Sequence, residues 1–262
     1  MTIHDWLLKK SQQEKIAMIT CYDAWSAQLI NDTAIDAVLV GDSIGMVVYG
    51  DDNTFHVTVD LLANHTNAVS KTCKKPFIIT DMPFLADQKG LTQTMRAVEK
   101  LVLAGAKAIK IEGLRGKEKT IKHIIDAGIP VMAHLGLTLQ HLNQIGGFKV
   151  QGKTHEHAEE IFNHAKQLED LGVFAIVLEC IPSSLAKRIT ENLRIPTIGI
   201  GAGNQTDGQI LVLHDMLGLN PKFKAKFVKT FMNGGELVQA ALNQYASEVK
   251  NITYPDATHS YE

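Results

Sequence analysis

Polar residues of the kinds that do chemistry stand at or just beyond the ends of short apolar runs in this sequence. They are Asp42, Asp81, Lys110, Glu112, His134 and Glu179, with Gly201 at a corresponding place. Carboxylates, amines and imidazoles are the groups with which proteins hold cations, bind anions and transfer protons. If the apolar runs are parallel strands of a barrel, their ends open onto one face, where barrel active sites lie. We therefore treat these residues as one candidate site.

The first part of the candidate site consists of Asp42, Asp81 and Glu112. Three carboxylates cannot lie close together in the ionised state without a compensating cation. Sites built from oxygen ligands select hard divalent ions, Mg²⁺ before Zn²⁺. The alternative is that one or more of these carboxylates caps a helix or pairs with Lys110. Asp42, in the string "GDS", could also belong to a turn.

The second part is the pair Lys110 and Glu112, which stand two residues apart in one apolar run. On a strand, that spacing places both side chains on the same face. A lysine inside a barrel needs an anionic partner. Either Glu112 itself or the carboxylate of a substrate would serve, and the sequence leaves both open.

Glu179 and His134 complete the candidate site. Glu179 ends the run "FAIVLE", and a carboxylate beside so apolar a stretch suits a general base. The alternative for Glu179 is a structural ion pair with Arg188 or Lys187. His134 ends "PVMAH" and could orient a substrate oxygen, or it could be a hydrogen-bonded structural residue.

Two glycine-rich segments could contact ligands. "GIGAGN", residues 199–204, offers closely spaced backbone N–H groups that could cradle an anion, or it could be a tight turn. "GGFKVQGK", residues 146–153, is long and glycine-rich, as a lid or a cofactor-contact loop would be. His155 and His157 follow it, but no cysteine or strand-end partner completes a zinc site, so we interpret them as facing solvent.

The apolar runs alternate with segments of helical spacing. The runs are Ile16–Thr20, Ala37–Val40, Pro76–Thr80, Ala106–Ile111, Pro130–Ala133, Val173–Leu178, Pro196–Ile200 and Gln209–Leu213. The helical segments are Ala24–Asn31, Val59–Lys71, Leu91–Ala104, Lys117–Asp126, Glu156–Leu171, Ser184–Asn192 and Phe227–Lys250. Runs so continuously apolar are typical of parallel strands covered on both faces.

This alternation predicts an α/β fold, a (β/α)8 TIM barrel. We expect a single domain over residues 1–262, with a short N-terminal helix from Asp5 to Gln13 and C-terminal helices. An open doubly wound sheet is the second choice. The charged residues nearly balance, with a net charge of −2. The sequence therefore lacks the excess of basic residues that would indicate nucleic-acid binding. No apolar run approaches the roughly 20 residues that span a bilayer, and three scattered cysteines are typical of reduced thiols in a cytoplasmic protein.

Ten strings of this sequence, taken in order, resemble the ketopantoate hydroxymethyltransferase family (3-methyl-2-oxobutanoate hydroxymethyltransferase). They are "TCYD", "LVGDSIGM", "VTVD", "TDMPF", "AGAKAIKIEG", "HLGLT", "GGFKVQGK", "LECIP", "IPTIGIGAGNQTDGQILVLHDMLGL" and "PKFKAKF". They cover the chain from about residue 16 to residue 250. The sequence departs from the family in "YGDDNTFHVTVD", which contains Asp51, and at Leu139, where "GLTLQ" replaces the usual "GLTPQ".

The resemblance implies an activity and its partners. The family transfers a hydroxymethyl group from 5,10-methylenetetrahydrofolate to 3-methyl-2-oxobutanoate, giving 2-dehydropantoate for pantothenate and coenzyme A synthesis. The reaction passes through a Mg²⁺-stabilised enolate, with one Mg²⁺ per subunit. The implied partners are a small 2-keto acid, a folate and further copies of the chain, a homodecamer in bacterial members. Neither a nucleic acid nor a membrane is expected.

The resemblance also implies roles for particular residues. The family's Mg²⁺ ligands match Asp42, Asp81 and Glu112, and its proton acceptor, the catalytic residue, matches Glu179. Its keto-acid contacts match Asp42, Ser43, Asp81 and Lys110, and positions near the substrate match Tyr22 and His134.

Two other hypotheses compete with this one. A lyase or mutase of the phosphoenolpyruvate mutase and isocitrate lyase kind would also chelate a 2-keto acid with carboxylates. It would need an acid–base segment similar to "KKCGH", which we do not find in this sequence. A barrel kept only for assembly or ligand binding should lack at least one of the four candidate carboxylates, yet all four are present.

Overall fold

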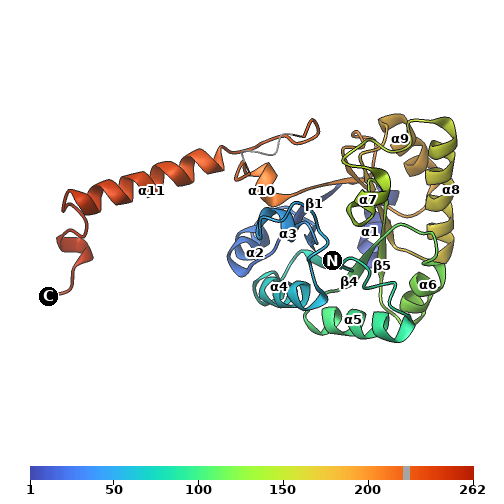
Figure 1. The fold of residues 1–262 in the computed structure, drawn as a ribbon, viewed down its shortest axis with the longest axis horizontal. Coiled ribbons are helices and arrows are strands. Elements are labelled where there is room, and N and C mark those ends of the chain that lie inside the picture. The colour runs from blue at the N-terminus through green and yellow to red at the C-terminus, as the bar shows by residue number, and fades with distance from the viewer. Residues whose placement is uncertain (221–224) are drawn as a thin grey trace. The chain divides into compact units, whose positions relative to one another are not determined.

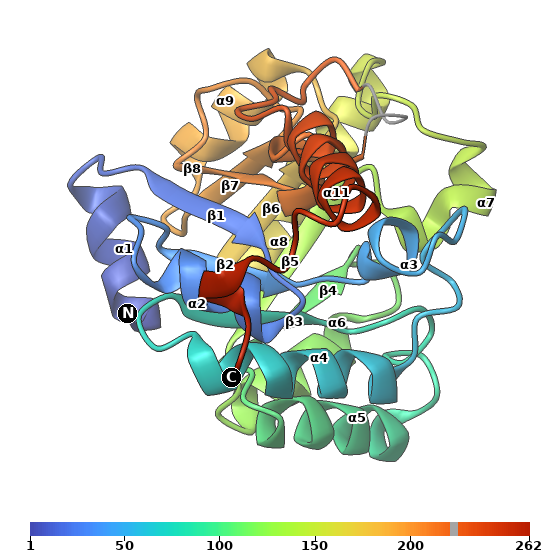
Figure 2. The same cartoon turned by 90° about the vertical axis from the view of Figure 1, so that its left-hand side faces the viewer.

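A closed barrel of eight parallel strands forms the centre of the fold (Figure 2). The computed structural model describes residues 1–220 and 225–262. The strands are β1 (Ile16–Thr20), β2 (Ala37–Val40), β3 (Phe77–Asp81), β4 (Ala108–Glu112), β5 (Val131–Gly136), β6 (Ala175–Glu179), β7 (Thr197–Ile200) and β8 (Gly208–Leu211). Each pairs with its neighbours in sequence, and β8 closes on β1. The predicted (β/α)8 barrel is confirmed, and the open doubly wound sheet is wrong.

The longer helices that follow the strands lie around the outside of the barrel, whereas α1 precedes β1 (Figures 1 and 2). The helices of the barrel unit are α1 (Ile3–Ser11), α2 (Ala24–Asn31), α3 (Ile44–Val47), α4 (Val59–Thr72), α5 (Leu91–Leu103), α6 (Glu118–Asp126), η1 (Leu139–His141), α7 (Leu142–Ile145), α8 (His155–Leu171) and α9 (Ser183–Asn192). Local signals fix the starts of three of them: the side chains of Asp23, Thr58 and Thr154 accept backbone N–H bonds at the N-termini of α2, α4 and α8. The short η1, α3 and α7 have no sequence period long enough to be predicted.

The strand register brings the candidate residues side by side. Asp81 on β3 lies opposite Lys110 on β4, and Glu112 on β4 lies opposite His134 on β5. Because the strands are parallel and adjacent, residues near their carboxyl ends become neighbours although they are far apart in sequence. The barrel thus gathers these side chains at one mouth.

The opposite end of the barrel is closed by α1. Trp6 on α1 is fully buried, and its ring packs edge-on against Phe77 and Phe174, with centroids 6.1 and 5.2 Å away. These phenylalanines stand where β3 and β6 begin, so the aromatic cluster fills the N-terminal end of the barrel. The predicted N-terminal helix is confirmed, beginning two residues earlier than expected.

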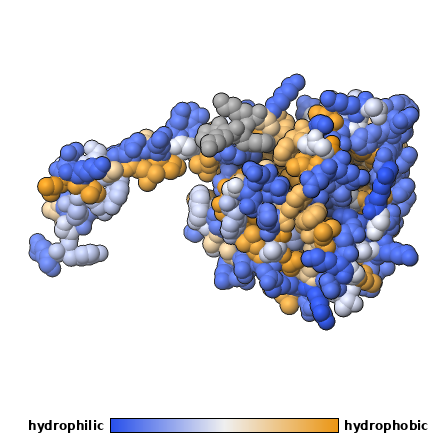
Figure 3. Space-filling view, viewed as in Figure 1, coloured by the Kyte–Doolittle hydropathy of each residue, from blue (hydrophilic) through white to orange (hydrophobic). Residues whose placement is uncertain are grey.

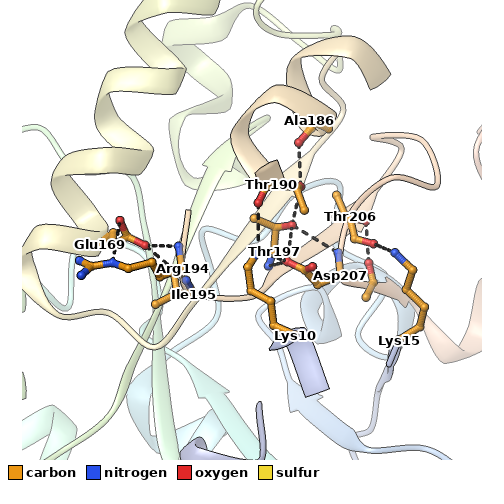
Figure 4. A network of polar contacts seen from close by, with 11 residues as sticks. Lys10, Lys15, Glu169, Ala186, Thr190, Arg194, Ile195, Thr197, Thr206 and Asp207 are labelled. Atoms are coloured by element: carbon orange, nitrogen blue, oxygen red, sulfur yellow. Dashed lines mark hydrogen bonds and ion pairs between the residues drawn. The ribbon is translucent and has the colours of Figure 1, made fainter. Parts of the chain in front are cut away.

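A network of polar contacts ties the same end together (Figure 4). The Lys10 ammonium donates to Asp207 Oδ2 at 2.7 Å and to the carbonyl of Thr190 at 3.0 Å. Asp207 Oδ2 also accepts from the backbone N–H of Thr197 at 2.9 Å. These contacts join α1, α9 and the segments that enter β7 and β8.

The chain divides into two compact units, Met1–Val212 with the barrel and Leu213–Glu262. The second unit contains α10 (Leu213–Met216), α11 (Gly234–Lys250) and η2 (Ala257–His259). Along α11, hydrophobic residues gather on one side (Figure 3), where helical spacing places Val238, Leu242, Tyr245 and Val249. The prediction of a single domain over residues 1–262 stays a prediction. No helix of the described ranges is long and apolar enough to cross a membrane.

The last long helix begins later than the sequence predicts. It starts at Gly234, not at Phe227. The backbone N–H groups of Gly234 and Gly235 donate to the carbonyls of Leu217 and Gly218, 2.8 and 3.0 Å away, in the turn that follows α10. The chain packs so closely there that a Cβ on Gly234 would lie 2.4 Å from the Leu217 oxygen. The string "PKFKAKF" starts in residues 221–224, which lie outside the described residues.

Candidate active site

A small cavity of about 80 Å³ opens at the carboxyl ends of the strands. Its lining contains seven of the predicted site residues: Asp42, Ser43, Asp81, Lys110, Glu112, His134 and Glu179. Tyr22 stands behind this lining, where its hydroxyl shares a 2.7 Å hydrogen bond with Ser43 Oγ. The remainder of the wall is apolar and includes Val177, Ile200 and Ile210. A lining that is polar on one part and apolar on the other suits a small molecule with one polar end and one apolar end.

Asp42, Asp81 and Lys110 form one side of the cavity. Asp81 Oδ1 accepts from the Lys110 ammonium at 2.5 Å, and Asp81 Oδ2 accepts from the backbone N–H of Asp42 at 2.9 Å. Burial and the carboxylates of Asp81 and Glu112 raise the pKa of Asp42. Burial alone would lower the pKa of Lys110, but Asp81, Glu112 and Asp42 raise it, so the ammonium stays charged. Of the alternatives for Lys110, the Glu112 pair is wrong, because Asp81 is the partner.

Glu112, His134 and Glu179 form the other side, as a chain of three groups. His134 Nδ1 lies 3.2 Å from Glu112 Oε1, and His134 Nε2 lies 3.2 Å from Glu179 Oε2. Burial opposes protonation of His134, but the two carboxylates raise its pKa to about 9. Burial opposes ionisation of Glu112, but His134 and Lys110 lower its pKa to about 2. The imidazolium therefore forms an ion pair with each carboxylate and places a positive charge beside Glu179.

Gln140 is a site residue that sequence reasoning missed. Its side-chain Nε2 donates to Asp42 Oδ2 at 2.9 Å and to the carbonyl of Met82 at 2.8 Å. Its backbone N–H donates to Glu112 Oε2 at 3.0 Å. One residue thus fixes two of the predicted metal ligands. The signal was the position of the glutamine shortly after β5, the strand that carries His134, but an amide does not titrate and is not recognised as a catalytic group from its type.

The cavity wall carries an excess of negative charge that a divalent cation could neutralise. In the described part of the chain, four carboxylates line the wall, Asp42, Asp81, Glu112 and Glu179, against the two cations Lys110 and His134. With all four ionised, the negative charge exceeds the positive charge by two, and burial together with the charges of Asp81 and Glu112 raises the pKa of Asp42. A divalent cation matches that excess, and carboxylate oxygens are the donors that Mg²⁺ takes.

Asp42 and Asp81 fit such a cation best, because Asp81 lies against the backbone of Asp42. Within residues 1–220 and 225–262, no three His, Cys, Asp or Glu side chains converge closely enough to hold an ion together. Glu112 is turned toward His134 and Gln140. The prediction of three direct ligands, Asp42, Asp81 and Glu112, stays a prediction.

Two further sequence predictions concern the pairing of Glu179 and the segment "GIGAGN". The proposed pairing of Glu179 with Arg188 or Lys187 is wrong, since Glu179 lies against His134 while Arg188 pairs with Glu159. The segment "GIGAGN" contains a turn, in which Gly201 and Gly203 have φ of 64° and 78°. Ile200 is the residue of this segment that lines the cavity.

A closed parallel barrel with a small, carboxylate-rich cavity at the carboxyl ends of its strands defines a barrel enzyme of small-molecule chemistry. The family model for ketopantoate hydroxymethyltransferase matches residues 1–257, and the chain belongs to that family of transferases. A protein named 3-methyl-2-oxobutanoate hydroxymethyltransferase from Bdellovibrio bacteriovorus is 52% identical over 260 residues, covering 99% of both chains. One of the same name from Francisella tularensis is 52% identical over 253 residues, covering 97% of this chain and 96% of its own.

Solved structures of lower sequence identity share the fold. A phosphonopyruvate hydrolase in complex with oxalate and Mg²⁺ superposes with a TM-score of 0.64 at 12% identity, covering 99% of this chain and 93% of that chain. A 2,3-dimethylmalate lyase, a member of the phosphoenolpyruvate mutase and isocitrate lyase superfamily, gives 0.60 at 16% identity, covering 99% and 91%. At these identities the likeness concerns the barrel alone.

Proposed function

We propose that this protein transfers a hydroxymethyl group from 5,10-methylenetetrahydrofolate to 3-methyl-2-oxobutanoate, forming 2-dehydropantoate. Membership of the family supports the reaction. The observation that carries it is the cavity itself, where a charged lysine and a histidine-held glutamate face one small space with an apolar wall. That space matches a short keto acid with a carboxylate at one end and a branched alkyl group at the other.

Lys110 binds the substrate carboxylate in this proposal. Its ammonium has three donors and uses one on Asp81. The Ser43 hydroxyl, which Tyr22 holds at 2.7 Å, offers a second contact. Val177, Ile200 and Ile210 would surround the branched alkyl group. This arrangement presents the C3 hydrogen to the side of the cavity that Glu179 occupies.

Asp42 and Asp81 would hold Mg²⁺, with Glu112 contributing a third negative charge nearby. The cation would supply Lewis-acid stabilisation of the negative charge that develops on the keto oxygen. Gln140 keeps Asp42 and Glu112 in place through its amide and backbone N–H groups. Positioning of this kind lowers the cost of assembling the ligands when the ion binds.

Glu179 accepts the C3 proton of the keto acid. Its Oε2 lies 3.2 Å from His134 Nε2, so the carboxylate is oriented and its charge is balanced before the substrate arrives. C3 then forms a carbon–carbon bond to the methylene carbon of the folate as the bond from that carbon to N10 breaks, and the oxygen of water replaces N5 on the same carbon. The C3 proton held by Glu179 and one proton of the water pass to the two folate nitrogens. Tetrahydrofolate leaves as the second product. Assembly as a homodecamer and a cytoplasmic location belong to the same proposal.

The experiment that tests this function is an assay of the purified protein with 3-methyl-2-oxobutanoate, 5,10-methylenetetrahydrofolate and Mg²⁺. We expect 2-dehydropantoate to form, the rate to fall when a chelator removes the metal, and the rate to return when Mg²⁺ is added back. Pyruvate, which lacks the branched C3, serves as the control substrate. An absence of product at every Mg²⁺ concentration would refute the proposed function.

A further inference from the structure

A second cavity, of about 460 Å³, lies beside the candidate active site. We call it the side cavity. Its walls come from the segment after β4, the end of β5, α7 and one side of α8. The short η1 separates the two cavities: Leu139 lines the small cavity, His141 lines the side cavity, and the backbone N–H of Gln140 between them donates to Glu112. A molecule in the side cavity is therefore next to the reacting centre.

The floor of the side cavity is apolar. Leu114, Leu135 and Ile161 line it and are almost fully buried. They come from three different elements, the β4–α6 segment, β5 and α8. An aliphatic floor of this kind packs against the face of a flat ring, and a volume of several hundred Å³ is typical of sites for drug-sized ligands.

Two cations also line the side cavity, Arg115 and Lys117. The Lys117 ammonium is buried and lies 2.6 Å from Asp87 Oδ2, and Arg115 lies 2.6 Å from Glu160 Oε1. Each of these contacts occupies one donor, whereas an ammonium has three donors and a guanidinium has five. Donors therefore remain for an anionic group of a ligand.

Three histidines add further donors. His141 and His164 are partly buried, and burial lowers the pKa of each. His157 Nδ1 accepts from the backbone N–H of Gly152 at 3.3 Å. In a neutral imidazole that leaves the proton on Nε2 as a donor. Among the described residues that line the side cavity, Glu160 is the sole carboxylate, so donors exceed charged acceptors.

We propose that the side cavity binds the p-aminobenzoyl-glutamate part of the folate co-substrate. The aryl ring would lie on the apolar floor, and the glutamate carboxylates would accept hydrogen bonds from Arg115, Lys117 and the histidines. The pterin and its one-carbon unit would then reach around η1 to the small cavity. Gln151 of the glycine-rich segment also lines the side cavity, which gives that segment its role as a co-substrate contact. This inference rests on the proposed function.

The test compares two co-substrates, 5,10-methylenetetrahydrofolate and 5,10-methylenetetrahydropteroate, which lacks the glutamate. Arg115→Gln is the informative variant, because the side chain is 75% exposed and its loss leaves the core intact. The control is Lys119→Gln, an exposed lysine on α6 that does not line the cavity. We expect Arg115→Gln to raise the KM for the folate roughly tenfold, as loss of one charge-assisted hydrogen bond does.

The KM for the pteroate should change less than twofold in Arg115→Gln, and Lys119→Gln should match the wild type with both co-substrates. Equal KM values for the two co-substrates in the wild-type protein, with no effect of Arg115→Gln, would overturn the inference and leave the proposed function standing. Calorimetric binding of p-aminobenzoyl-glutamate separates the two claims. One outcome would support the site and refute the function: the wild-type protein binds p-aminobenzoyl-glutamate, Arg115→Gln weakens that binding, and the wild-type protein never transfers a one-carbon unit.

Discussion

The two ends of the barrel differ in how their charged groups are balanced. At the N-terminal end, Asp207 is matched by the Lys10 ammonium and by the N–H of Thr197, so charge and hydrogen bonds are satisfied within the fold (Figure 4). At the mouth, four carboxylates face two cations, and burial together with the neighbouring carboxylates raises the pKa of Asp42. The first end is organised for stability. The second keeps an electrostatic imbalance that a cation and a substrate relieve.

The largest effect should come from removing one charge of the mouth while keeping its shape. In Asp81→Asn the amide oxygen can still accept from Lys110, but the amide nitrogen cannot accept the backbone N–H of Asp42, and the group carries no charge for a cation. We expect Mg²⁺-dependent activity to fall by roughly a hundredfold or more. Circular dichroism should remain that of the wild-type barrel, because Lys110 retains Glu112 as a negative neighbour. Unchanged turnover would contradict the metal assignment.

The same kind of change at the N-terminal end should act on stability instead. Asp207→Ala removes the partner of Lys10 and the acceptor of Thr197. We expect the free energy of unfolding in urea to fall by about 2 kcal/mol, as when a partly buried charged hydrogen-bond partner is lost. At a temperature where the variant is folded, its turnover should lie within twofold of the wild type. A variant that is stable but inactive would break the contrast between the two ends.

Gln140 extends the comparison of the two ends, because its hydrogen bonds hold carboxylates at the mouth in place. Gln140→Leu keeps the size of the side chain but removes the donor to Asp42. We expect the Mg²⁺ concentration for half-maximal activity to rise about tenfold, within the range for lost partners of metal ligands. Saturating Mg²⁺ should restore most of the rate. If the Mg²⁺ requirement stays at the wild-type value, Gln140 does not position the carboxylate.

A smaller effect concerns the pH dependence of stability in metal-free protein. The pKa of His134 is about 9 in the folded state, above the usual value of 6.5. A raised pKa means that the ion pairs of His134 contribute stability fully below about pH 6.5 and lose it as the pH rises through about 9. The urea midpoint should decline across that window. His134→Asn should flatten the decline, whereas His123→Asn, an exposed histidine on α6, should leave it unchanged.

The sequence predicts the barrel well because its strands are continuously apolar and its long helices have clear periods and caps. It predicts the site residues because a chemical group at a strand end can be recognised without coordinates. Pairings are harder, since they depend on register: Lys110 pairs with Asp81 across the β3–β4 ladder, not with Glu112 on its own strand. Gln140 and the side cavity could not be predicted, because a short 3₁₀ turn has no sequence period.

The central claim is that Glu179 takes the C3 proton of the keto acid at this mouth. Exchange of that proton into deuterated water, followed by NMR with Mg²⁺ and without folate, tests it most directly. Glu179→Gln keeps the shape beside His134 but cannot accept a proton. We expect the wild-type protein to catalyse the exchange and the variant to be slower by roughly 10² or more, the usual contribution of a general base. A variant that exchanges at the wild-type rate, yet fails to transfer the one-carbon unit, would contradict the account.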